Sequence, residues 1–88
     1  MSCRRCLVSG HVHGVFFRAS TREQAQQLGV SGYARNLPDG RVEVMACGAD
    51  DSVTALCAWL QSGPPQAHVN ACVCEPATGE DYSQFVIR

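Results

Sequence analysis

The residues best suited to chemistry lie in a stretch bracketed by glycines, from Gly10 to Arg18. Glycines allow backbone N–H groups to turn inward without a Cβ clash, which makes a concave nest for an anion. Arg18 adds a planar fork of donors that matches the oxygens of a phosphate group. We therefore predict that this stretch holds a small oxyanion. Composition alone also allows an ordinary turn between a strand and a helix, with a surface arginine.

Two elements must position this stretch. Residues 3–9 alternate loosely between two faces, which predicts a strand. Ser20 followed three residues later by Glu23 is typical of a capping box, and Gly29 is a natural left-handed stop. A first helix is therefore expected to run to about Leu28. Its unpaired N–H groups and positive dipole end would lie beside whatever the stretch binds.

A hairpin is predicted next. Residues 38–40 form a Pro-Asp-Gly turn between two alternating runs, 31–36 and 41–47. In the second run, one face is expected to be buried in the core and is formed by Val42, Val44 and Ala46. The opposite face is expected to be in water and is formed by Arg41, Glu43 and Met45.

The second half of the chain predicts one more helix and two strands. Asp50 or Asp51 can cap the helix, Gly63-Pro64-Pro65 ends it, and its apolar residues recur at helical spacing: Val53, Leu56, Cys57 and Leu60. Strands are expected around 68–74 and at 85–87, with a polar loop through 79–81 between them.

The order β-α-β-β-α-β with a short extra C-terminal strand indicates the split βαβ arrangement. We predict an α+β fold, a ferredoxin-like α/β sandwich with both helices on one face of a mainly antiparallel sheet, the other face being partly open to water. A chain of 88 residues is expected to form one domain, 1–88.

Composition and motif spacing exclude several functions. The formal net charge of -1 provides no basic field, which argues against nucleic acid or an anionic membrane as a partner. The chain has no lysine, so the stretch is not a Walker A loop, and no acidic residue is placed for a dinucleotide site. No signal peptide or membrane span is visible, so a cytoplasmic monomer acting on a small molecule is expected.

Two spaced motifs carry a family resemblance. The run Gly10-His11-Val12-His13-Gly14-Val15-Phe16-Phe17-Arg18 resembles the acylphosphatase signature Gly-x-Val-Gln-Gly-Val-x-Phe-Arg. The run 29–36, followed by Asp39-Gly40 and Val42-Glu43, is similar to the family's Gly-x-x-Gly-x-Val-x-Asn-x-x-Asp-Gly-x-Val-Glu. The ending Phe85-Val86-Ile87-Arg88 is also similar, so the resemblance covers nearly the whole chain.

The resemblance implies hydrolysis of the carboxyl–phosphate bond of acyl phosphates such as benzoyl phosphate, without a metal or cofactor. In the family, Arg18 and Asn36 would be catalytic, with Asn36 orienting the attacking water. The phosphate would be held by Arg18 and by the residues of the loop, His11, Val12, His13, Gly14, Val15, Phe16 and Phe17. A carboxylate leaving group has a conjugate acid with a pKa of about 4, so no general acid is needed. A phosphate-binding or acyl-phosphate-binding module without catalysis is the alternative.

One position departs from the family pattern, because His13 stands where the family has Gln. Its side chain either packs beside the anion or reaches it, and the second case would add a pH dependence near the imidazole pKa of about 6.5. His11 is expected to face solvent, and a metal site on His11 and His13 lacks partners at ligand spacing. Phe17 is expected to anchor the loop in the core.

Six cysteines are predicted mainly as buried free thiols, since the expected compartment is reducing. Cys3 and Cys6 point to opposite faces of their strand, which prevents joint metal ligation. Cys72 and Cys74 share a face, but two thiols make an incomplete metal site, so core packing is favoured. A disulfide across strands, between Cys3 and Cys47, is geometrically conceivable if the two residues lie opposite each other.

Overall fold

The computed structural model describes residues 1–13, 15–79 and 82–88. Gly14, one of the predicted phosphate-binding residues, and residues 80–81 of the predicted polar loop lie outside the described residues. The elements in chain order are β1 (Ser2–His11), α1 (Val15–Leu28), β2 (Ser31–Asn36), β3 (Val42–Gly48), α2 (Asp50–Leu60), β4 (His68–Pro76) and β5 (Phe85–Ile87).

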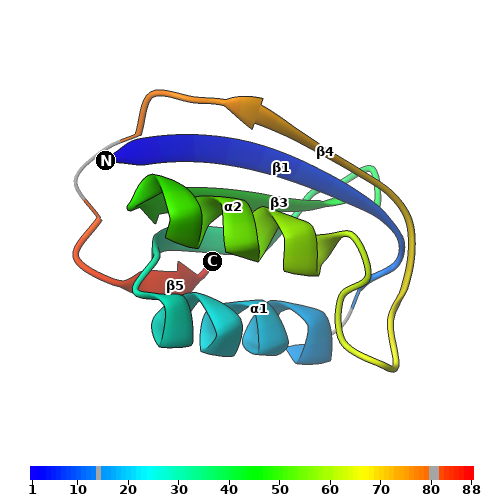
Figure 1. The fold of residues 1–88 in the computed structure, drawn as a ribbon. Coiled ribbons are helices and arrows are strands. Elements are labelled where there is room, and N and C mark those ends of the chain that lie inside the picture. The colour runs from blue at the N-terminus through cyan, green and yellow to red at the C-terminus, as the bar shows by residue number, and fades with distance from the viewer. Residues whose placement is uncertain (14, 80–81) are drawn as a thin grey trace.

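One five-stranded sheet, in the order β4-β1-β3-β2-β5, forms the first layer of the molecule. Its neighbours pair antiparallel, except that β5 runs parallel to β2. Figure 1 shows α1 and α2 lying side by side against one face of this sheet. The predicted α+β sandwich, with a short fifth strand, is therefore confirmed. In the part of the chain that the structure describes, no helix is long and apolar enough to cross a membrane.

The core lies between the helices and the sheet. Cys6 and Val8 of β1 are fully buried there, together with the predicted apolar face of α2: Val53, Leu56, Cys57 and Leu60. The prediction for the cap of α2 was wrong, because Ala49 occupies the N-cap, although Asp51 inside the first turn accepts a hydrogen bond from the Ser52 amide at 2.9 Å. Ala49 already has the extended backbone conformation of a cap, so both aspartates fall inside the first helical turn.

The start of α1 was also predicted wrongly. The helix begins at Val15, so Ser20 and Glu23 lie within it rather than at a capping box. β1 meanwhile continues to His11 through a register shift at Gly10, whose φ of 129° places its α-carbon against the β4 backbone where a side chain would clash. The predicted loop therefore shrinks to a few residues, with a strand on one side and a helical turn on the other.

The second run of the hairpin does not have a wet face. β3 is the central strand, and Glu43, expected in water, is only 2% exposed. Its carboxylate accepts hydrogen bonds from Arg5, Tyr33 and Arg35. Burial alone raises the pKa of Glu43, but these three donors together hold it below its ordinary value. Met45 is buried on the same face in a small cluster with Tyr33.

Two disulfides flank β1, contrary to the prediction of mainly free thiols. Cys3 is bonded to Cys47, its direct register partner on β3. Cys6, on the opposite face of β1 as predicted, is bonded to Cys74, its register partner on β4. Each disulfide forms because the strand register places its two cysteines directly opposite each other on neighbouring strands. The prediction of core packing did not require such pairs.

Candidate active site

The connection between β1 and α1 places an open helix end at the edge of the sheet. Val12 and His13 follow the strand, and the helix starts at Val15. The first four N–H groups of an α-helix, here those of residues 15–18, have no carbonyl partner within the helix. No acidic residue lies in this first turn. The amides and the helix dipole therefore present partial positive charge to any anion at this point.

Two buried apolar side chains hold the connection in place. Val12 is 1% exposed, and Phe17, the predicted anchor, is 3% exposed. The Phe17 ring packs against Trp59 of α2, with 6.4 Å between ring centroids. Thr21 donates a hydrogen bond to the carbonyl oxygen of Phe17 at 2.9 Å. Phe16, by contrast, is 72% exposed, so its side chain contributes little to the core.

Arg18 is tied to the end of the chain by one of its three guanidinium nitrogens. Its Nη1 donates to the backbone oxygen of Arg88 at 3.2 Å. The backbone nitrogen of Arg88 in turn donates to the oxygen of Ala34 on β2 at 2.9 Å. The Nε atom of Arg18 is buried and has no hydrogen-bond partner among the described residues. One donor of the fork is thus fixed by the protein and another is left free.

Asn36 is the last residue of β2 and belongs to the same corner. It lies two residues beyond Ala34, about 7 Å along the strand, and shares the face that Ala34 presents to the helices. Its Oδ1 atom is buried and, like Nε of Arg18, has no partner among the described residues. The fold therefore brings Arg18 and Asn36, 18 residues apart in the sequence, to the corner where α1 begins and β2 ends.

The two histidines of the loop are both exposed. The ring of His11 lies across the β1–β4 pair from His68, with 6.5 Å between centroids. Among the described residues they belong to no group of three or more metal-ligating side chains. Whether the side chain of His13 packs beside the anion or reaches it stays a prediction.

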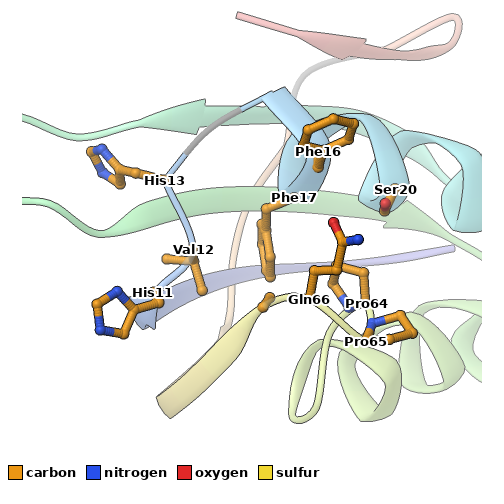
Figure 2. A pocket seen from close by; sticks show the side chains of 10 residues that line it. His11, Val12, His13, Phe16, Phe17, Ser20, Pro64, Pro65 and Gln66 are labelled. Carbon is orange, nitrogen blue, oxygen red and sulfur yellow. The ribbon is translucent and has the colours of Figure 1, made fainter.

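A hollow of about 370 Å³ lies beside the loop, and the sequence did not predict it. Loop residues 11–13 and helix residues Phe16, Phe17 and Ser20 line one side, and residues 64–67 line the other (Figure 2). Arg18 does not line the hollow. Phe16 and Ser20 are each two residues from Arg18 in the sequence, so their side chains lie on nearly the opposite side of the helix. The Gly-Pro-Pro signal after α2 indicated only a helix end, whereas the folded chain places that turn against the first turn of α1.

Comparison with known proteins decides the family. The family model described as acylphosphatase matches residues 4–87. This chain belongs to the acylphosphatase family. A curated acylphosphatase from Halorhodospira halophila is 55% identical over 83 residues, which are 94% of this chain and 90% of that protein.

Solved acylphosphatase structures agree with the fold of this chain. The acylphosphatase structure from Coxiella burnetii has a TM-score of 0.93 and 47% identity, covering 99% of this chain and 92% of that one. The acylphosphatase structure from Bacillus subtilis has the same TM-score, 0.93, at 28% identity, covering 100% and 99% of the two chains. The predicted family and fold are therefore both confirmed.

Proposed function

We propose that this chain hydrolyses the carboxyl–phosphate bond of acyl phosphates at the corner between α1 and β2, releasing a carboxylate and inorganic phosphate. Membership of the acylphosphatase family supports this reaction. One observation supports the residues. Among the described residues, two buried side-chain atoms have no partner: a donor, Nε of Arg18, and an acceptor, Oδ1 of Asn36. A buried polar atom without a hydrogen-bond partner destabilises the folded protein unless a ligand supplies that partner.

The phosphoryl group binds at the open end of α1. The unpaired N–H groups of the first turn of the helix donate to its oxygens, and the helix dipole favours its negative charge. Arg18 adds a charged donor: its Nη1 is bonded to the Arg88 carbonyl, and its buried Nε has no partner among the described residues. These donors stabilise charge on the equatorial oxygens as the transition state forms.

Asn36 positions the nucleophile. Its free Oδ1 accepts a hydrogen bond from a water molecule, which leaves a lone pair of the water directed at phosphorus, in line with the departing carboxylate. The water oxygen bonds to phosphorus and passes one proton to a phosphoryl oxygen, the bond from phosphorus to the carboxyl oxygen breaks, and the carboxylate leaves with the electron pair. Because that carboxylate is a weak base, with a conjugate pKa of about 4, it needs no protonation.

Benzoyl phosphate hydrolysis measured with EDTA tests this proposal. The unaltered protein is expected to turn over in EDTA, since the proposed groups include no metal. Arg18→Gln is expected to lose both the rate and the inhibition by inorganic phosphate. Asn36→Ala is expected to lose rate by about 100-fold or more while phosphate still inhibits. Arg22→Gln, one turn further along α1 and exposed, is the matched control and should keep full activity.

Two results would contradict the assignment. Equal activity in Arg18→Gln and the unaltered protein would remove Arg18 from the reaction. Binding of inorganic phosphate without turnover above background would make the site a binding module rather than an enzyme.

The substrate is proposed to be a small acyl phosphate, handled by a cytoplasmic monomer without nucleic acid. The net charge of -1 supports this choice, because it provides no broad basic surface for a polyanion. Light scattering at increasing protein concentration tests the monomer, and a mass above that of one chain would contradict it.

A further inference from the structure

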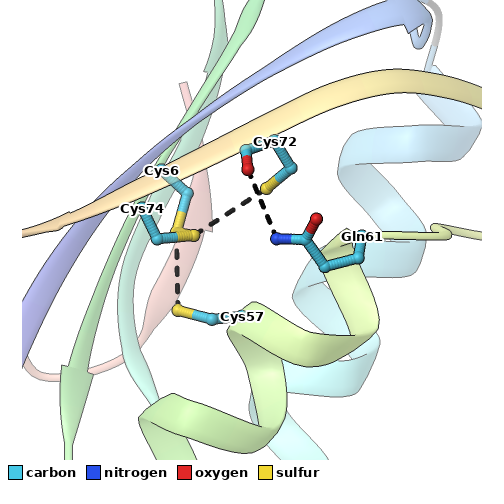
Figure 3. Close-up of a disulfide and its surroundings, with 5 residues drawn as sticks. All are labelled: Cys6, Cys57, Gln61, Cys72 and Cys74. Atoms are coloured by element: carbon cyan, nitrogen blue, oxygen red, sulfur yellow. Dashed lines mark hydrogen bonds between the residues drawn. A yellow bond between two sulfur atoms is a disulfide. The ribbon is translucent and has the colours of Figure 1, made fainter.

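Four cysteines from three elements meet beneath α2, at the side of the sheet where β4 forms the edge. They are Cys6 of β1, Cys57 of α2, and Cys72 and Cys74 of β4 (Figure 3). The Sγ atoms of Cys6 and Cys57 are 3.4 Å apart, and those of Cys72 and Cys74 are 3.8 Å apart. The Sγ atoms of Cys6, Cys57 and Cys74 all lie within 4.8 Å of one another.

The proposed hydrolysis uses none of these four thiols. They lie on β1, β4 and α2, whereas the proposed reaction takes place where α1 and β2 meet at the other side of the sheet. Packing does not explain their chemistry either, because an aliphatic side chain fills a core position without a reactive sulfur. Three of the sulfurs, those of Cys6, Cys57 and Cys74, already lie within 4.8 Å of one another. The sulfur of Cys72, outside that group but 3.8 Å from that of Cys74, is placed to complete the four ligands of a closed thiolate site.

We propose that these four cysteines, when the Cys6–Cys74 bond is reduced, form a binding site for one soft divalent metal ion such as Zn²⁺. A dithiol or phosphine reductant supplies the two electrons that convert the disulfide, with two protons, into two thiols. The ion then binds four sulfurs and releases four protons to solvent. The disulfide and the metal-bound form are thus two states of one cluster.

The spacing of the sulfurs fits such an ion. Metal–sulfur bonds of about 2.3 Å in a tetrahedron place the sulfurs about 3.8 Å apart. The pairs Cys6–Cys57 and Cys72–Cys74 already have separations of 3.4 Å and 3.8 Å. Cys6 and Cys74 are direct register partners, so breaking their bond lets rotation about each side chain open the same spacing without moving the backbone.

The surroundings suit a thiolate site with one way in. Cys6 and Cys57 are buried at 0% and 6% exposure, whereas Cys72 and Cys74 are half-buried at the edge strand and give an ion its route of entry.

A second contact holds the cluster from the helix side. Gln61, just after α2, donates from Nε2 to the backbone oxygen of Cys72 at 3.3 Å. This bond links the end of the helix that carries Cys57 to the strand that carries Cys72 and Cys74.

The test begins with protein that is fully reduced with a phosphine and kept free of oxygen. Cd²⁺ is titrated in, and thiolate-to-metal charge-transfer absorption reports binding to sulfur rather than to histidine. One ion per chain is expected. Cys57→Ser is expected to weaken binding by about 100-fold or more. The double variant Cys3→Ser with Cys47→Ser, which removes the other disulfide, is the matched control and should bind one ion with unchanged affinity.

A second readout needs no variant. In the unaltered chain, Cd²⁺ is expected to protect Cys6, Cys57, Cys72 and Cys74 from alkylation, while Cys3 and Cys47 react at the same rate with and without the ion. Absence of the charge-transfer band, loss of binding in the control variant, or equal protection of all six cysteines would each overturn the proposal.

Discussion

The two helices of this protein begin with opposite charge patterns. The first turn of α1 contains no acidic residue and ends on Arg18, whereas the first turn of α2 contains Asp50 and Asp51. Both ends present unpaired N–H groups and the positive end of a helix dipole. The carboxylates of α2 offset that charge from within the chain. At α1 the same charge stays available, and the proposed anion site depends partly on this absence of carboxylates.

The largest effect is expected from a carboxylate placed in the first turn of α1, which removes the difference in charge between the two helix ends. Phe16→Asp changes a side chain that is 72% exposed, so the fold should tolerate it. The new charge competes with the phosphoryl group, and kcat/KM for benzoyl phosphate is expected to fall about 100-fold. Phe16→Asn, of the same size but neutral, is the control. If both variants lose activity equally, the effect is steric and the contrast of charge is wrong.

Inorganic phosphate should raise the free energy of unfolding by binding at the first turn of α1, and it should not bind at the first turn of α2. A ligand at 100 times its Kd raises the free energy of unfolding by about 2.7 kcal/mol. Chemical unfolding with and without phosphate is expected to show this gain for the unaltered chain and to lose it in Arg18→Gln. A variant with Asp50→Asn and Asp51→Asn should keep the gain unchanged. An additional gain in that variant would show that α2 also accepts phosphate once its carboxylates are removed.

The carboxylate of Glu43 lies on the face of the sheet away from both helices. Its contribution to stability is therefore expected to be independent of the charges at the two helix ends. Its lowered pKa means that its contribution to stability is present above the unfolded pKa of 4.5 and is lost as pH falls through the folded value. Glu43→Gln is therefore expected to cost about 2 kcal/mol near pH 7, and the difference from the unaltered chain should shrink below about pH 4.5. Urea unfolding across this pH range measures the difference.

Hydrolysis of benzoyl phosphate by the folded Glu43→Gln variant at pH 7 is expected to match the unaltered rate, since Glu43 lies across the sheet from α1. A large loss of rate in fully folded protein would connect this carboxylate to the reaction and weaken the separation between the two faces.

The smallest effect is expected at α2. Asp50→Asn with Asp51→Asn should lower the free energy of unfolding by about 1 kcal/mol, because two favourable interactions with the helix dipole are lost. The loss should diminish in high salt, and hydrolysis should stay unchanged. Unfolding at two ionic strengths measures it, and a loss that is independent of salt would argue against a dipole effect.

Local sequence signals predicted most of the fold. The spacing of Val53, Leu56 and Leu60 indicated α2 and its buried face, and the Pro-Asp-Gly turn indicated the hairpin. Gly29, with φ of 73°, ends α1 as expected. The start of α1 was missed, because burial of Phe17 extends the helix toward the N-terminus, to a start before the local cap signal at Ser20.

The candidate site was predicted by resemblance more than by composition. Arg18 and Asn36 lie 18 residues apart; chain order allowed them to meet, and the motif named them as a pair before the fold brought them to one corner. The hollow against residues 64–67 was missed, since it depends on contact between segments far apart in the chain. Burial of Glu43 was missed for a similar reason, because alternation in one strand does not tell whether that strand is central in the sheet.

The covalent links around β1 have a consequence for association between copies of the chain. β4 is an edge strand with unpaired backbone groups, and Val73 on it is 56% exposed. Such an edge can recruit the edge of a second molecule or exchange its strand with one. The Cys6–Cys74 bond prevents β4 from detaching from β1, so strand exchange at this edge first requires a chemical reduction, and the oxidised protein should resist forming swapped oligomers at this strand.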